Sequence, residues 1–170
     1  MSDLPQQTLS RPTTWAAPRF GRIMLNAALW AAVMAISAWY GMWTLEWETK
    51  ARVARIVLLF AVGAFLAFPF GILIARLLTW RGSREVAFAA AFLSLTVATI
   101  GVTALIFAFD YRTYYAEWHD DTFSVRLVFE IVFTTLSAVY QFAVLGVRLY
   151  FPIGFLGLFV ASWLFARARN

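Results

Sequence analysis

Three long apolar runs follow a polar N-terminal segment, and each is long enough to form a membrane-spanning helix. They extend from Met24 to Leu45, from Ile56 to Leu78 and from Val86 to Phe109, and Arg76 is the only charged residue within them. An α-helix rises about 1.5 Å per residue, so about 20 apolar residues cross the ~30 Å hydrocarbon layer of a bilayer. Arg76 lies near the end of its run, where a long side chain reaches the headgroups. The pattern therefore predicts three transmembrane helices.

A fourth apolar region, from Leu127 to Phe165, allows several interpretations. Its 39 residues are too many for one perpendicular helix and just enough for two short ones, and its only charges are Glu130 and Arg148. Pro152 also interrupts it, and proline removes a backbone hydrogen bond from a helix. Three paths are open: two spans with a turn near Arg148, one span at about 149–166 after a helix that lies in or dips into the membrane, or one long helix kinked at Pro152.

Composition places this pattern in the membrane class. Of the 170 residues, 62% are hydrophobic and 14% are charged, whereas soluble domains have about 45–50% apolar and about 25% charged residues. We therefore expect an all-α membrane protein: a small polytopic transmembrane helical bundle, with four crossings preferred and a broken or in-plane helix before the last one. We assign residues 1–22 to a mobile cytoplasmic N-terminal tail and residues 23–170 to the transmembrane domain.

The positive charges predict the topology. Arginines in the N-terminal tail and in the second connection favour the cytoplasm for both, and four crossings return Arg167 and Arg169 to the same side. The first connection carries Lys50, Arg52 and Arg55 and mildly violates this rule on the outside. Because Lys50 is the only lysine and alanine is frequent, we infer a GC-rich genome and a bacterial inner (plasma) membrane. The net charge of +5 comes from residues at the ends of apolar runs, so it does not indicate nucleic-acid binding.

Small side chains predict where the helices pack. In the third span they recur at spacings of four and three residues, which places them on one helical face. Such faces let membrane helices approach closely, within one chain or between copies. The predicted packing ridge consists of Ala87, Ala91, Ser94, Ala98 and Gly101.

A narrow stripe of polar residues follows one helical face of the fourth region, and apolar side chains occupy the other faces. Glu130 is its unusual member, because an ionisable group at membrane depth costs roughly 2.5–3.5 kcal/mol and by default marks a functional site. We expect Arg126, one turn away, to pair with Glu130. The stripe is expected to face protein and to hydrogen-bond with the backbone or with Thr96, Thr99 and Thr103 of the third span. Its members are Arg126, Glu130, Thr134, Ser137, Gln141 and Arg148.

Few residues offer catalytic chemistry. The chain has no cysteine, so catalysis by a thiolate and metal sites built on cysteine are excluded. It also has no P-loop, HExxH motif or dinucleotide fingerprint, and no cofactor is expected. The only histidine, His119, lies beside Asp120 and Asp121, but adjacent residues do not converge on one metal ion by themselves. We interpret this segment as an interfacial loop, and a lipid-modifying enzyme that uses it is the third-ranked hypothesis.

The first functional hypothesis is a non-enzymatic accessory or structural subunit that lies in the lipid bilayer and binds another membrane protein or a second copy of itself. Short connections, the lack of a catalytic motif and the narrow polar stripe favour it. The alternative is a small oligomeric transporter or channel with a polar path along Glu130, Thr134, Ser137 and Gln141. The dependence of flux on Glu130 distinguishes the two.

Overall fold

The structure is a computed structural model that describes residues 17–45, 49–79, 82–115 and 125–168. Within these residues every regular element is helical, as the apolar pattern predicts. The elements are α1 (Ala17–Leu45), α2 (Lys50–Leu78), α3 (Arg84–Tyr115), α4 (Val125–Gln141), a π-helical turn η2 (Phe142–Gly146), a 3₁₀ turn η3 (Val147–Tyr150) and α5 (Ile153–Arg167).

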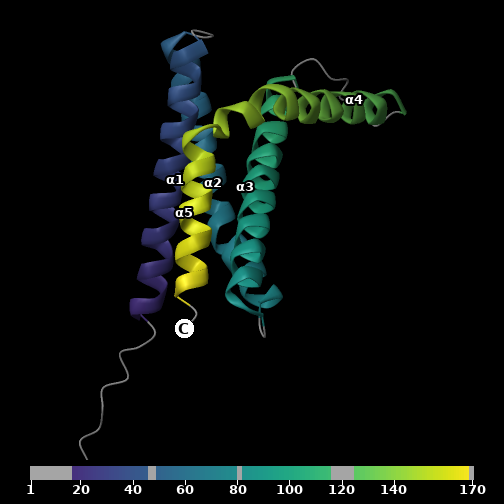
Figure 1. Cartoon of the computed structure of the whole chain (residues 1–170). Helices are drawn as coiled ribbons and strands as arrows, with labels where there is room; N and C mark the ends of the chain where they lie inside the picture. Colours follow the sequence, from purple (N-terminus) through teal and green to yellow (C-terminus); the bar gives the residue numbers. More distant parts are fainter. Residues whose placement is uncertain (1–16, 46–48, 80–81, 116–124, 169–170) are drawn as a thin grey trace, which may run out of the picture.

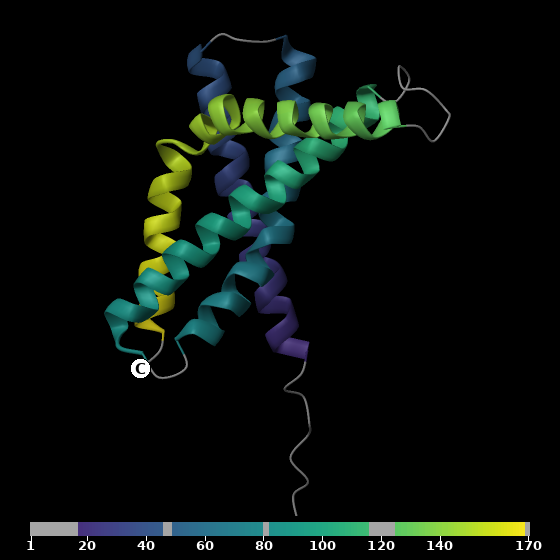
Figure 2. The same cartoon turned by 90° about the vertical axis from the view of Figure 1, so that its right-hand side faces the viewer.

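The chain is a multi-pass membrane protein. Four helical segments are long and apolar enough to cross a bilayer, and α5 is a shorter apolar helix. Figure 1 shows α1, α2, α3 and α5 running side by side, whereas α4 lies across the end of α3. The N-terminal end of α1 and the C-terminal end of α5 lie at the same end of the bundle (Figures 1 and 2). The four segments that are long enough to cross are Phe20–Leu45, Lys50–Leu78, Arg84–Thr113 and Leu127–Tyr150.

The fourth apolar region has the geometry of the second of the three predicted paths: α4 lies across the bundle, and α5 then runs along it. The chain leaves α4 through η2 and η3, turns at Phe151 and Pro152, and continues as α5 (Figure 2). A residue before proline is driven out of the α region, and Phe151 is extended at φ −107° and ψ 141°. Pro152 is the N-cap residue of α5, where no intrahelical hydrogen bond needs its missing N–H. Proline therefore sets the place where the direction changes.

The helices are longer than the apolar runs that predicted them. α1 begins at Ala17, within the segment assigned to the tail, and Pro18 is tolerated in its first turn, where N–H groups lack intrahelical acceptors. α2 begins at Lys50 and α3 ends at Tyr115, each six residues beyond the expected limit. Hydropathy marks the part of a helix in hydrocarbon, whereas its hydrogen-bonded ends continue into the polar layer.

Two clusters of buried apolar side chains lie one after the other along the bundle. One joins α1, α2, α3 and α5, and the other joins α1 and α2 to η2 and η3. The second cluster fixes the junction between α4 and α5 inside the bundle. The members are Ala27, Trp30, Met34, Ala64, Phe68, Leu95 and Leu158 in the first, and Ala38, Met42, Phe60, Phe142 and Leu149 in the second.

Two glycines of α2 bring it against α3, in the most extensive helix contact of the bundle. A Cβ atom added to Gly63 would lie 2.9 Å from Thr103 Cα, and one added to Gly71 would lie 2.9 Å from Leu95 Cδ2. The contact at Gly63 is with backbone and shorter than real Cβ contacts, so only glycine allows the observed separation there, whereas at Gly71 a Cβ atom would require the Leu95 side chain to shift. α2 stays helical through Pro69 between these two positions.

Candidate functional site

α4 and the turns that follow it carry the polar stripe; α4 lies across the end of α3, and the turn η2 packs inside the bundle. Phe142 of η2 packs with Met42 and Phe60. Phe60 is ten residues from the start of α2, which corresponds to about 15 Å along that helix. Figure 2 shows the ends of α1 and α2 extending past α4. α4 therefore lies near the boundary between hydrocarbon and headgroups rather than above it.

The stripe is turned partly toward the bundle. Glu130, Thr134 and Gln141 are half-buried, whereas Ser137 on α4 and Arg148 on η3 are exposed. Thr134 Oγ1 donates to the Glu130 carbonyl at 2.6 Å, within α4. The side chain of Arg126 lies outside the described part of the structure, so its expected pairing with Glu130 stays a prediction.

The expected partners of the stripe on α3 were wrong. Gln141 Nε2 donates to Tyr111 Oη at 3.4 Å, close to the C-terminal end of α3. Thr96 and Thr103 donate to carbonyl groups of α3 itself, and Thr99 accepts a hydrogen bond from Trp30 of α1. The prediction assumed that the stripe runs alongside α3, but α4 crosses the end of that helix. Only the last turns of α3 are then within reach.

The outward face of α4 is apolar over about half of the helix circumference. Thr135 and Ser137 are the only exposed polar side chains on the described part of α4. Figure 1 shows that the first turns of α4 project beyond α3. In the sequence, this surface was indicated by the apolar residues on the helical faces that do not carry the polar stripe. We define the α4 face as Val125, Val128, Phe129, Val132, Phe133, Leu136, Val139 and Tyr140, all exposed.

The small-residue ridge of α3 is buried for most of its length. Ala87, Ala91 and Ser94 are buried and Ala98 is half-buried, but Gly101 is exposed and has open space beside it. The buried side of α3 continues through Thr99 and Thr103 instead. Gly63 and Gly71 of α2, which let it approach α3, were noticed in the sequence only as neighbours of Pro69, and no packing role was predicted for them.

A serine of α1 holds the junction between η3 and α5. Ser37 is fully buried, and its Oγ donates to the Leu149 carbonyl at 2.8 Å and accepts from the Gly154 N–H at 3.0 Å. Both backbone groups lose their intrahelical hydrogen bonds where the helix breaks. Inside a membrane such groups are tolerated only when another part of the protein hydrogen-bonds to them. Ser37 was not a candidate from the sequence, because its partners are 112 and 117 residues away.

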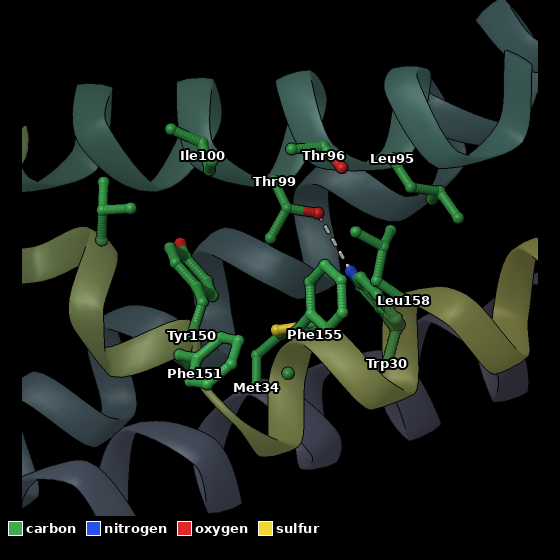
Figure 3. A pocket seen from close by; sticks show the side chains of 12 residues that line it. Trp30, Met34, Leu95, Thr96, Thr99, Ile100, Tyr150, Phe151, Phe155 and Leu158 are labelled. Carbon is green, nitrogen blue, oxygen red and sulfur yellow. Dashed lines mark hydrogen bonds between the residues drawn. The ribbon is translucent and has the colours of Figure 1, made fainter. Parts of the chain in front are cut away.

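A cavity of about 180 Å³ lies between α1, α3 and α5 (Figure 3). Its walls are apolar apart from threonine hydroxyls that are engaged elsewhere. Trp30 Nε1 donates to Thr99 Oγ1 at 3.1 Å across one wall, and Thr96 Oγ1 donates to the Phe92 carbonyl at 2.7 Å. The cavity therefore presents mainly hydrocarbon and ring surfaces, and the buried hydroxyl of the lining residue Tyr150 has no hydrogen-bond partner among the described residues.

The described residues bring no metal site together. No group of three or more His, Asp and Glu side chains within them is arranged to hold a metal ion. His119, Asp120 and Asp121 lie outside the described residues, so the hypothesis of an enzyme built on them stays a prediction.

No protein-family model matches the sequence, and neither a curated protein nor a solved structure shows significant similarity to it.

Proposed function

We propose that this chain is a non-enzymatic accessory or structural subunit that binds another membrane protein through the α4 face. The main support for this proposal is the surface of α4, which is apolar, exposed and projects beyond α3. A helix that lies in the plane of a membrane and contacts only lipid keeps a polar face toward water. In α4 the half-buried polar residues are turned to the bundle, so about half of the circumference is left apolar. A second protein would cover both the part of that surface that faces lipid and the part that faces water.

The composition of the α4 face suits a protein interface. Phe129, Phe133 and Tyr140 are exposed on it, and aromatic side chains dominate the binding energy of many interfaces. Gln141 supports this role from the other side of the helix, because its bond to Tyr111 ties α4 to α3.

The direction of the stripe favours a binding role over transport. Because α4 lies across the bundle, a path along Glu130, Thr134 and Gln141 runs across the direction of the other helices rather than along it (Figures 1 and 2). A route for ions or solutes has to join the two sides of the bilayer. The subunit proposal needs no such route.

We further propose a bacterial inner membrane with the N-terminus in the cytoplasm, which places α4 at the outer leaflet. Arg22, Arg76, Arg84 and Arg167 gather at the end of the bundle opposite α4, as the positive-inside rule prefers for a cytoplasmic end. The chain has no cysteine, so single-cysteine labelling is clean. A cysteine at Asn170 should react with an impermeant maleimide only after the membrane is opened. Labelling in sealed spheroplasts would show that this end lies outside and would contradict the proposed orientation.

The subunit proposal is tested by purifying the tagged chain from its native membrane in mild detergent and measuring the intact mass of the complex. We expect a partner at fixed stoichiometry. Phe129→Ala with Phe133→Ala should weaken its retention by roughly 30-fold or more, because each truncation of an interface aromatic costs about 1–2 kcal/mol. Leu66→Ala with Phe70→Ala is the matched control, because both side chains are exposed on α2 and away from the α4 face.

Recovery of the chain alone, or as a closed homo-oligomer, would overturn the proposal. If the two double variants lost partner retention equally, the partner would not bind through the α4 face, and the proposal for that surface would be overturned.

A further inference from the structure

We infer that the cavity between α1, α3 and α5 is a binding site for one acyl chain of a membrane glycerophospholipid. The inference rests on the cavity alone and does not depend on a protein partner at the α4 face. An acyl chain enters from the flank of the bundle, between α3 and α5, and fills the space with its methylene groups.

The cavity opens where the bundle meets lipid. Val147, Phe151 and Phe155 line it and are also exposed on the bundle surface, so they form its rim. On α3 the neighbouring Val97 is exposed as well. Leu95, on the inner wall, lies eleven residues into α3, or about 17 Å along the helix. A molecule at this depth arrives from the hydrocarbon of the bilayer, where acyl chains are the abundant species.

The chemistry of the walls selects an apolar occupant. Figure 3 shows Leu95, Ile100 and Leu158 around the space, with Phe155 at its edge. Tyr150 contributes its ring and one buried hydroxyl, which has no hydrogen-bond partner among the described residues. Such a space stays free of water, because a buried water needs two or more polar partners.

The size of the cavity fits a segment of an acyl chain. A cavity of about 150 Å³ lined by Leu, Ile and Phe admits benzene, so this one holds an alkyl segment of about six carbons. An empty space leaves its lining without dispersion contacts on one side. A lipid chain that moves into it gives up no water and gains these contacts.

The first test uses the unaltered chain in nanodiscs of phosphatidylcholine that carries a photoreactive diazirine on one acyl chain. We expect crosslinks concentrated in the peptides that contain Ile100 and Phe155, roughly tenfold above those at Leu58 and Leu66 of α2, which are at least as exposed as Phe155, a ratio equivalent to about 1.4 kcal/mol. Uniform labelling of all lipid-facing positions would overturn the inference, as would crosslinks from the photolipid that avoid these two peptides.

The second test fills the cavity. Ile100→Phe adds volume inside it, whereas Leu93→Phe adds similar volume on the exposed side of the same helix. The first change should lower crosslinking at Phe155 to the level of the other exposed residues, and the second should leave it unchanged. Far-UV circular dichroism and gel filtration verify that both variants are folded. Unchanged crosslinking in a folded Ile100→Phe variant would overturn the inference.

Discussion

Replacing Ser37 by alanine tests whether one hydroxyl group holds the break between η3 and α5. The substitution removes two hydrogen bonds at once, to the Leu149 carbonyl and from the Gly154 N–H, at a site with no solvent exposure. A buried donor or acceptor without a partner costs about 1–3 kcal/mol. Hydrogen bonds between membrane helices are worth about 0.6 kcal/mol on average and up to about 1.7 kcal/mol. We expect Ser37→Ala to lower the free energy of unfolding by about 1–3 kcal/mol.

The assay is equilibrium unfolding in mixed micelles with a rising fraction of dodecyl sulfate, followed by circular dichroism. Ser162→Ala is the matched control. Ser162 is also fully buried, but its hydroxyl only donates to the Leu158 carbonyl of its own helix. That carbonyl keeps its helical N–H partner, so we expect a loss below about 0.5 kcal/mol. Equal losses in the two variants would refute the idea that Ser37 stabilises the break.

Further substitutions test the packing of the bundle by the same unfolding assay. Gly63→Ala should cost about 1–3 kcal/mol, because its new Cβ atom meets α3 backbone. Gly101→Ala should stay within about 0.5 kcal/mol, because nothing lies within 4 Å, and a loss as large as at Gly63 would contradict this contrast. Trp30→Phe removes the bond to the α3 threonine and should cost about 1 kcal/mol beyond any packing change. Arg55→Ala breaks an exposed 2.7 Å ion pair with Asp110 and should cost less than about 1 kcal/mol, with no loss left at high salt.

The apolar runs predicted the number and order of the helices because hydropathy is a local property. Each run of about 20 apolar residues became a helix, and Pro152 marked the change of direction, since proline acts on its immediate neighbours. The in-plane path of α4 was one of three open interpretations. Sequence alone did not choose among them, because all three bury a similar amount of apolar surface.

The contacts between distant segments were beyond the sequence. Of the partners expected for the polar stripe, Thr134 does use the backbone, but the mid-helix threonines of α3 are not used, because the angle between α4 and α3 decides which residues meet and brings Gln141 to Tyr111. Ser37, which lies in the alanine-rich first span, was not predicted to bond to another helix for a related reason. A serine in an apolar helix usually bonds to its own backbone, and nothing local indicates that this one serves another helix.

The dependence of the last helical break on Ser37 has a consequence for the order of assembly in the membrane. The ribosome makes α1 first and α5 last, and the two meet across more than a hundred residues. The serine is therefore already in place when the segment around Pro152 emerges. α4 and α5 can insert as one apolar stretch and bend only on reaching α1, so the first three helices serve as the template on which the C-terminal segment is shaped.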